Sequence, residues 1–407
     1  MTYADLYKNE LLQEVIPFWE HYSIDTKYGG FFSCIDNQNK VFDTDKFMWL
    51  QCRQIWMFAT LYDELEQNKK WLSIAEGGAE FILKYGHDGV FNWYFSLTQN
   101  GSPLIAPYNI FSYTFACLSL AKMYKITNEE RYKKACLKTL EHIHQREENP
   151  KGKWNKSVEG TRPLKNFALP MILCNLYNEM GSLLPEQTKK EKATSCVNEI
   201  FDQFWDSERG IILENVTLEG QFSDTFEGRL FNPGHGLEAM WFIMELGQQY
   251  NRPDWIEKSV NCALSLAEKG WDQEFEGIFY FLDVEGHPPQ QLEWDQKLWW
   301  VHLEAMICFL KAYELTQNKA CLEWFEKIHN YAWNHFKDPK NKGEWYGYLN
   351  REGRVLLALK GGKWKGCFHV PRALLKLHQL AGKQKGVPKL IKDLKILGLS
   401  LFLLKIK

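Results

Sequence analysis

The chain has 407 residues and a formal net charge of −2, and 45% of its residues are hydrophobic. Such a composition buries a large core, and the near-neutral charge excludes a general electrostatic affinity for nucleic acids or anionic membranes. The first residues lack the basic and then apolar leader of a signal peptide, and the longest apolar run, at 396–404, is too short to span a bilayer. The ten cysteines occur singly, without metal-ligand spacing. We therefore expect a cytoplasmic protein that binds neither nucleic acid nor membrane.

Apolar residues recur with helical periodicity in twelve segments of the chain. Stretches rich in Gly and Pro separate these segments, and short aromatic runs such as 31–32 and 279–281 predict small hairpin strands in the loops. In chain order the predicted helices span about 5–22, 47–66, 70–85, 108–125, 129–146, 165–180, 188–205, 234–250, 254–270, 297–315, 319–336 and 371–381.

A weak motif, an Asp followed by Gly and aromatic residues, recurs in the loops between the predicted helices. It begins at Asp25, Asp88, Asp206, Asp272 and Asp338, and a double-length gap places a sixth copy near residues 149–154. Six units of roughly 60 residues, each with two helices, predict an (α/α)6 barrel in which six inner helices are enclosed by six outer ones. An open α-solenoid is the alternative, but the count of six and the apolar character of alternate helices favour closure. We expect one domain over 1–382 and a Lys-rich tail over 383–407, either docked as a further helix or loosely attached.

Two histidines are predicted at the starts of helices. His369 lies in the segment KGCFHVPR (365–372), where a helix is expected to begin near Pro371 because proline is tolerated in the first helical turn. His235 has the same setting two positions after Pro233. Two imidazoles presented at helix starts point to two proton-transfer groups. The alternative for His369 is a histidine that is simply packed in the core.

Glu238, three positions after His235, is expected to share a helix face with that histidine and to orient its ring. Two alternatives stay open. One is a capping and packing role, and the other is a His-x-x-Glu metal site with His369, His302 and Glu304 as further ligands. We predict that no metal is bound.

Arg53 interrupts the otherwise apolar helical segment WLQCRQIW (49–56). Arginine is rarely buried unless paired, so Arg53 either forms a buried ion pair or faces a cavity, where it would stabilise a developing oxyanion. In the segment WWVHLE (299–304), His302 and Glu304 are two positions apart and point in different directions. We rank Glu304 above His302 as the cavity-facing group, with an ordinary helix–helix hydrogen bond as the alternative.

Further side chains are candidates for contacts to a substrate. Tryptophan rings stack on the C–H faces of sugars, and amide or guanidinium groups bind hydroxyl or acyl oxygens. The candidates are Trp49, Asn166, Arg229, Trp299 and His302.

Six stretches of the chain, in order, carry a resemblance to a known family. They are 49–56 (WLQCRQIW), 232–239 (NPGHGLEA), 291–294 (QLEW), 297–306 (KLWWVHLEAM), 343–349 (GEWYGYL) and 365–372 (KGCFHVPR). Over roughly residues 5–380 the chain resembles N-acylglucosamine 2-epimerase, also called renin-binding protein.

This resemblance implies an (α/α)6 barrel and an isomerase that interconverts N-acetylglucosamine and N-acetylmannosamine, in amino-sugar and sialic acid metabolism, without a required cofactor. It implies that the essential groups are His235, His369, Arg53 and Glu304. It also implies a cytoplasmic homodimer, with ATP as a possible allosteric effector, to which animal members respond. Cellobiose 2-epimerases of the same superfamily carry another histidine in the helix after Asn166. This chain reads FALPMI there, which favours an N-acyl sugar as substrate.

Ring opening of such a sugar exposes an aldehyde at C1 and so acidifies the C2–H. In the expected mechanism one neutral histidine removes this proton, and a protonated histidine on the opposite face returns one. Arg53 would hold the charge on O1, and Glu304 would orient a hydroxyl or assist ring opening. Three alternatives stay open: a glycoside hydrolase that uses Glu238 and Glu304, an aldose–ketose isomerase, and a non-enzymatic binding module.

Overall fold

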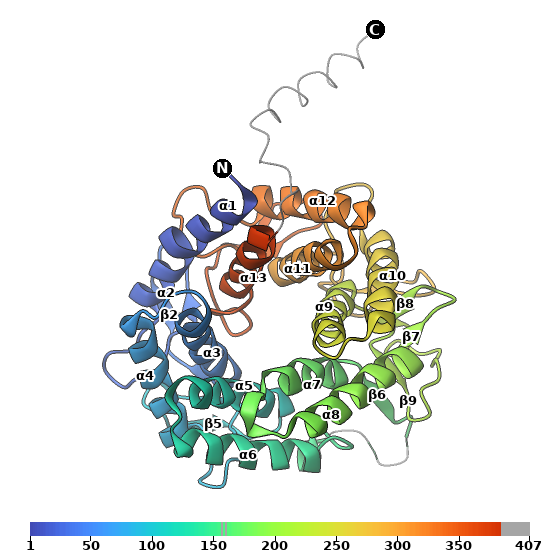
Figure 1. Ribbon diagram of the computed structural model, residues 1–407. Coiled ribbons are helices and arrows are strands. Elements are labelled where there is room, and N and C mark those ends of the chain that lie inside the picture. Colours follow the sequence, from blue (N-terminus) through green and yellow to red (C-terminus); the bar gives the residue numbers. More distant parts are fainter. Residues whose placement is uncertain (156–157, 159–160, 384–407) are drawn as a thin grey trace.

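The helices form two concentric rings in the computed structural model, which describes residues 1–155, 158 and 161–383 (Figure 1). The inner ring consists of α3 (Met48–Glu64), α5 (Ile110–Thr127), α7 (Ala168–Glu179), α9 (Pro233–Gln249), α11 (Trp299–Thr316) and α13 (His369–Lys383). The outer ring consists of α1 (Tyr3–Glu10) with α2 (Ile16–Tyr22), α4 (Lys69–Tyr85), α6 (Glu130–Gln145), α8 (Glu186–Glu199), α10 (Pro253–Gly270) and α12 (Lys319–His335). The predicted (α/α)6 barrel is confirmed, while the predicted tail from residue 384 onward lies outside the described residues.

The ring is closed by the two ends of the described chain. Each of the inner helices from α3 to α11 packs against the outer helix that follows it, and neighbouring inner helices pack side by side. The last inner helix, α13, packs instead against the first outer helix, α1 (Figure 1). This contact rules out the open solenoid. Short π-helical turns at Leu11–Val15 and Ile200–Phe204 extend α1 and α8, and 3-10 turns occupy Gly152–Trp154 and Gly181–Leu183.

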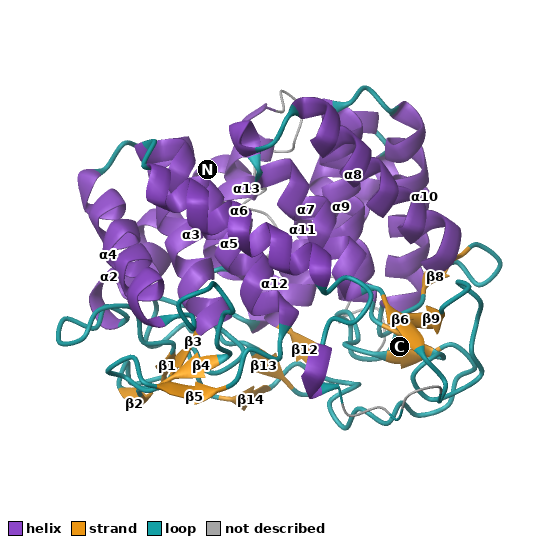
Figure 2. Cartoon of the chain, turned by 90° about the horizontal axis from the view of Figure 1, so that it is seen from below, coloured by secondary structure: helices purple, strands orange, loops and turns teal. Residues whose placement is uncertain are grey.

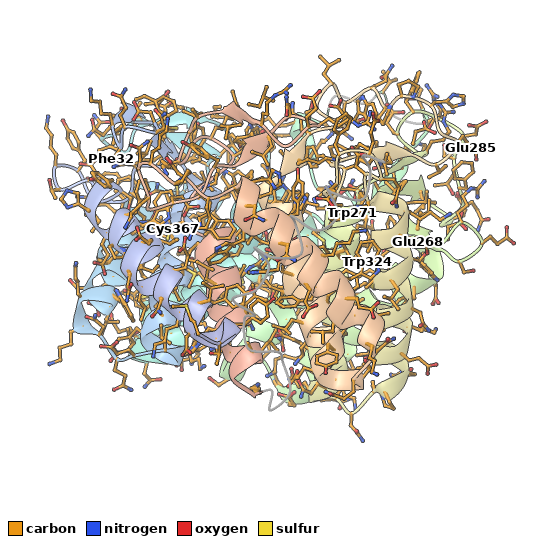
Figure 3. All side chains as sticks on the ribbon, turned by 90° about the horizontal axis from the view of Figure 1, so that it is seen from above. Phe32, Glu268, Trp271, Glu285, Trp324 and Cys367 are labelled. Atoms are coloured by element: carbon orange, nitrogen blue, oxygen red, sulfur yellow. The ribbon has the colours of Figure 1, made fainter. Side chains whose placement is uncertain are left out.

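Inner and outer helices differ in how much of their surface is apolar. In α3 every residue from 50 to 61 is buried, and in α11 every residue from 299 to 312 is buried. The outer helices bury one face and carry charged residues on the other, as an amphipathic helix at a protein surface does. Aromatic side chains fill the space near the outer layer; Trp271, just after α10, meets Trp324 of α12 edge to face at 5.7 Å between ring centroids (Figure 3).

Short strands gather in the loops at one end of the barrel (Figure 2). The predicted runs 31–32 and 279–281 lie outside them: Phe31 forms only an isolated bridge with Ile24, and β11 begins at Leu282. They pair as antiparallel β1–β2, β3–β4–β5, β6–β9, β7–β8, β10–β11 and β12–β13–β14. The strands are β1 (Cys34–Ile35), β2 (Val41–Asp43), β3 (Lys46–Phe47), β4 (Ser96–Leu97), β5 (Pro103–Ile105), β6 (Leu164–Asn166), β7 (Trp205–Asp206), β8 (Ile211–Ile212), β9 (Asn215–Thr217), β10 (Leu230–Phe231), β11 (Leu282–Asp283), β12 (Lys297–Leu298), β13 (Tyr348–Leu349) and β14 (Val355–Leu357).

The repeated Asp motif forms the same turn each time. In all five copies the Asp carboxylate accepts hydrogen bonds from backbone N–H groups two and three or four positions later, which fixes a tight turn just after an outer helix. The glycine that follows takes a left-handed conformation; at Gly277, φ is +76°, which only glycine adopts without strain. At the expected sixth copy the chain forms the 3-10 turn Gly152–Trp154.

Three of these Asp residues also bind a fully buried lysine. Lys46 binds Asp25 at 2.8 Å, Lys297 binds Asp272 at 2.9 Å, and Lys360 binds Asp338 at 2.9 Å. Lys46 and Lys297 lie in the strands that lead directly into α3 and α11. These two pairs therefore tie an outer-helix turn to the start of an inner helix, whereas Lys360 ties the turn at Asp338 to the loop between β14 and α13.

All ten cysteines are buried and unbridged. Burial raises the pKa of Cys52 to about 12, so this thiol is neutral and packs against its neighbours instead of acting as a nucleophile. Among the described residues, the helices are all too short or too polar to cross a membrane.

Candidate active site

A cavity of about 610 Å³ opens at the strand end of the barrel, among the N-termini of the inner helices. Each of these helices contributes to its wall from the first two turns. Together with the strand loops, they give a wall of Trp49, Arg53, Asn109, Phe111, Phe115, Ala168, Met171, Ile172, His235, Glu238, Tyr280, Glu293, Gln296, Leu298, Trp299, Trp300, Tyr348, Leu357, Trp364 and His369. The positive ends of six helix dipoles thus surround the cavity and favour negative charge in it.

His369 is the first residue of α13, two positions earlier than the predicted helix start. Its Nδ1 donates to Oε1 of Glu304 at 2.7 Å. On the other side of the ring, Nε2 lies 3.5 Å from Nη1 of Arg53. A carboxylate on Nδ1 fixes the tautomer in which Nε2 carries a lone pair, so His369 presents a proton acceptor at the cavity.

Glu304 is fully buried in α11 and serves His369, not a ligand. Its Oε2 accepts from the indole of Trp241 at 3.0 Å, and its Oε1 also accepts from Arg372 at 2.6 Å. Glu304 is not one of the described residues that line the cavity. The expected contact with a sugar hydroxyl is therefore replaced by a positioning contact with the imidazole of His369.

Arg372, which sequence reasoning did not select, joins two carboxylates beneath the cavity. Its Nη2 lies 2.5 Å from Oε1 of Glu238 and 2.6 Å from Oε1 of Glu304. Glu238 lines the cavity, but its partner is Arg372. The prediction that Glu238 orients His235 is therefore wrong. Arg372 lies one turn after His369, and this i, i+3 spacing predicts that the two side chains share a helix face.

His235, in the first turn of α9, is oriented by a different carboxylate. Its Nδ1 donates to Oε1 of Glu214 at 2.9 Å, and Glu214 is itself buried between β8 and β9. Backbone hydrogen bonds from Phe167 to Glu214 and from Glu214 to Leu230 hold this segment in place. Sequence reasoning missed Glu214, because its distance of 21 positions from His235 follows no helical rule.

Both catalytic candidates contact the same indole. The ring centroid of Trp300 lies 5.1 Å from that of His235 and 5.9 Å from that of His369. The two imidazoles, from α9 and α13, therefore both lie against one side chain of α11, the inner helix between them. Both histidines line the same cavity, as we expected.

The environments of the two histidines push their pKa values in opposite directions. Burial lowers the pKa of His369 well below its usual value, and the nearby Arg53 and Arg372 charges lower it further. Burial also acts to lower the pKa of His235, but the charge and hydrogen bond of Glu214 outweigh it and raise that pKa above its usual value. Near neutral pH, His369 is thus poised as a base and His235 as an acid.

Arg53 is a buried cation held between aromatic rings. Its guanidinium carbon lies 4.5 Å from the ring centroid of Trp49, 4.0 Å from that of Phe115 and 4.6 Å from that of Phe368. Burial lowers its pKa to about 9, so it stays charged at neutral pH. Its Nε has no hydrogen-bond partner within the described chain, and the side chain lines the cavity, where it can bind an oxyanion.

Trp49 and Trp299 line the cavity as expected. The indole nitrogens of both are buried, and in the part of the chain that the structure describes they have no hydrogen-bond partner. These unsatisfied donors suit a ligand that offers hydroxyl or carbonyl oxygens.

The remaining candidates lie elsewhere. His302 is fully buried; its Nε2 accepts from the Ile278 N–H at 2.9 Å and its Nδ1 donates to the Leu298 carbonyl at 2.7 Å. Burial lowers the pKa of His302 to about 3, so it is a neutral structural group. Asn166 donates to the backbone of Glu214 at 3.2 Å and thereby supports the His235 partner. Arg229 binds Asp283 and Asp224. These three are not among the described residues that line the cavity.

One cluster has the composition of a metal site. Ligand atoms of Glu238, Glu304 and His369 lie within 4.8 Å of one another. The guanidinium of Arg372 already bridges the two carboxylates and supplies their counter-charge. The donor set therefore fits a bound arginine better than a metal ion.

Comparison with known proteins identifies the family. A family model for N-acylglucosamine 2-epimerase (GlcNAc 2-epimerase) matches residues 30–373. The chain belongs to this family. It is 38% identical to N-acylglucosamine 2-epimerase of Rattus norvegicus over 379 residues, covering 91% of the chain and 90% of the relative. Against the Homo sapiens enzyme of the same name the identity is 36%, with 91% and 88% covered.

More distantly similar solved structures share the fold. A solved cellobiose 2-epimerase from Bacillus thermoamylovorans superposes with a TM-score of 0.81 at 20% identity, covering 92% of this chain and 98% of that one. A family 76 glycoside hydrolase gives a TM-score of 0.62 at 14% identity, covering 94% and 77%. This member of the N-acylglucosamine 2-epimerase family is therefore an isomerase of the epimerase class, and the hydrolase alternative is less supported.

Proposed function

We propose that the protein interconverts N-acetylglucosamine and N-acetylmannosamine by proton transfer at C2 of the ring-opened sugar. The observation that carries this proposal is the pair formed by His235 and His369, which both contact the ring of Trp300 and are each oriented by a buried carboxylate of their own. The names of the curated relatives at 36–38% identity support an N-acylglucosamine as the substrate.

The reaction begins with the aldehyde form of the sugar, in which C2–H is adjacent to a carbonyl. The neutral Nε2 of His369 removes the C2 proton, and the electron pair moves through C1 to O1, giving an enolate with a C1–C2 double bond and the acylamino group on C2. Arg53 and the surrounding helix N-termini stabilise that charge. His235, as an imidazolium, then delivers a proton to the opposite face of C2, so the configuration inverts.

At the end of this step the two histidines have exchanged protonation states. His369 then carries the added proton and His235 is neutral, which is the form required for the reverse epimer. The two forms hold the same number of protons and return to one another by exchange with solvent. No redox cofactor takes part in this scheme.

Incubation of N-acetylmannosamine with the enzyme in D₂O tests the proposal, with NMR as the readout. The expected product is N-acetylglucosamine that carries one deuterium at C2. A glycoside hydrolase gives no C2 deuterium, an aldose–ketose isomerase gives a ketose, and a binding module changes neither the sugar nor its isotope content. Any of these three results contradicts the proposal.

The homodimer, the cytoplasmic location, the role in amino-sugar and sialic acid metabolism, the lack of a required cofactor and the response to ATP stay predictions. Sedimentation of the purified protein gives the oligomeric state. Activity measured with and without ATP, after dialysis against a chelator, tests the effector and cofactor predictions together.

A further inference from the structure

One wall of the cavity is apolar and plays no part in the proton transfers. It consists of Phe111 and Phe115 from α5 and of Ala168, Met171 and Ile172 from α7. Within each helix these positions are three or four apart, or adjacent on the same face, so each helix turns an apolar surface to the cavity. The charged lining residues come instead from α3, α9, α13 and the loop before α11.

This wall, named here the α5–α7 wall, lies across the barrel from α11 and α13, and its α7 side adjoins α9. The inner helices follow one another around the ring in sequence order, so α5 and α7 face α11 and α13 across the central axis (Figure 1). Trp300 fills the sector between His235 and His369 on the α11 side. The free space beside the two histidines is therefore on the side of the α5–α7 wall.

The geometry of the intermediate directs the acyl group toward this space; this step rests on the proposed function. When C2 loses its proton it becomes planar, with one histidine on each face. Its nitrogen lies in that plane together with C1 and C3, and all three leave C2 sideways, between the two histidines. With the indole of Trp300 on one side, the opposite direction leads to the α5–α7 wall.

We infer that the α5–α7 wall is the subsite for the N-acyl chain, and that it accepts straight acyl chains longer than acetyl. The five side chains offer no hydroxyl, amide or charged group, so a second sugar placed there would leave its hydroxyls without partners. The cavity of about 610 Å³ is in the range of roughly 300–1,000 Å³ that holds drug-sized ligands, which leaves room beside a single sugar ring.

A series of N-acyl mannosamines tests this inference, with acetyl, propanoyl, butanoyl and pentanoyl chains and kcat/KM measured by NMR. Each methylene that enters an apolar subsite is expected to raise kcat/KM by up to about fourfold, until the chain outgrows the wall. We expect the butanoyl sugar to equal or exceed the acetyl sugar. A drop of tenfold or more at the propanoyl sugar, with the acetyl sugar still turned over, overturns the inference and leaves the proposed function intact.

Two variants locate the effect on α7. Ile172→Trp fills the subsite at a half-buried position and is expected to lower kcat/KM for the pentanoyl sugar at least tenfold more than for the acetyl sugar. Met171→Gln keeps the length of the side chain and makes it polar, so the gain for each methylene should vanish. Leu357→Gln makes a similar change at a lining residue of β14, outside the α5–α7 wall, and serves as the matched control.

The control should keep the chain-length dependence of the wild type. If Ile172→Trp lowers kcat/KM equally for all chain lengths, as the control is expected to do, the acyl chain binds elsewhere and the inference is wrong. If the wild type does not epimerise even the acetyl sugar, the proposed function fails, and the inference that rests on it fails as well.

Discussion

Glu214 holds His235 through a hydrogen bond of 2.9 Å between Oε1 and Nδ1. The contact gives His235 its orientation, and the charge of Glu214 is the main cause that opposes burial and raises the pKa of His235. His369 receives the equivalent contact from Glu304, but there two arginines act in the opposite direction. The site therefore contains two His–carboxylate pairs that differ in their surrounding charge.

The first prediction concerns Glu214→Gln. The amide oxygen can still accept from Nδ1, but the negative charge is lost, so the imidazolium of His235 becomes a scarcer species at neutral pH. We expect kcat/KM to fall on the order of 10²-fold, and the alkaline limb of the pH profile to move to lower pH. Glu227→Gln, at an exposed position of the same connection, is the control. An unchanged alkaline limb would mean that Glu214 has a structural role alone.

The second prediction concerns the two histidines. His235→Asn and His369→Asn each remove one proton-transfer group and should abolish epimerisation. The remaining histidine can still remove and return a proton on its own face, so each variant is expected to exchange the C2 hydrogen of one epimer with D₂O, and the two variants should differ in which epimer that is. NMR follows both processes in one sample. Near-wild-type turnover in both variants would disprove the two-histidine scheme.

The third prediction is the pH dependence of the wild type. His369 must be neutral, and since its pKa is lowered, activity should persist below pH 6.5 before it falls on the acid side. His235 must be protonated, and since its pKa is raised, activity should persist above pH 6.5 before it falls on the alkaline side. A bell-shaped kcat/KM profile, equal in both directions of the reaction, is expected. A single titration centred near pH 6.5 would contradict the assignment.

The fourth prediction separates a structural histidine from the catalytic pair. His302→Ala leaves the Ile278 N–H buried without its partner, which costs about 1–3 kcal/mol of unfolding free energy. We expect a lower urea midpoint and an unchanged pH profile of the remaining activity. His21→Ala, at an exposed position of α2, should alter neither quantity. A shifted pH profile in the His302 variant would show that this ring acts on the proton transfers.

Periodicity located the twelve helices to within a few residues, because alternation of apolar and polar positions is a local property of the chain. It also brought His235, His369, Arg53 and the two tryptophans to one end of the barrel, since all of them lie near starts of inner helices. The partners of the histidines were harder to find. The local rule for helix faces favoured Glu238 as the partner of His235, whereas the actual partner comes from a loop stabilised by β6–β9 pairing.

Glu304 illustrates the same limit. It is 65 positions from His369, and the hydrogen bond between them depends on how α11 packs against α13. Arg372 of α13 bridges Glu304 of α11 and Glu238 of α9. These contacts form only when the three inner helices are assembled. Single-helix spacing therefore identified the reacting groups, while the charges that tune them required the tertiary structure.

The packing of α1 against α13 has a consequence for biosynthesis. The helix that completes the ring is also the helix that carries His369, and it is made long after its partner. A contact between such distant parts of the sequence carries a high entropic cost and is typically slow to form. A partly folded chain therefore lacks its base until the last helix docks, and the recovery of activity during refolding reports directly on the final closure of the barrel.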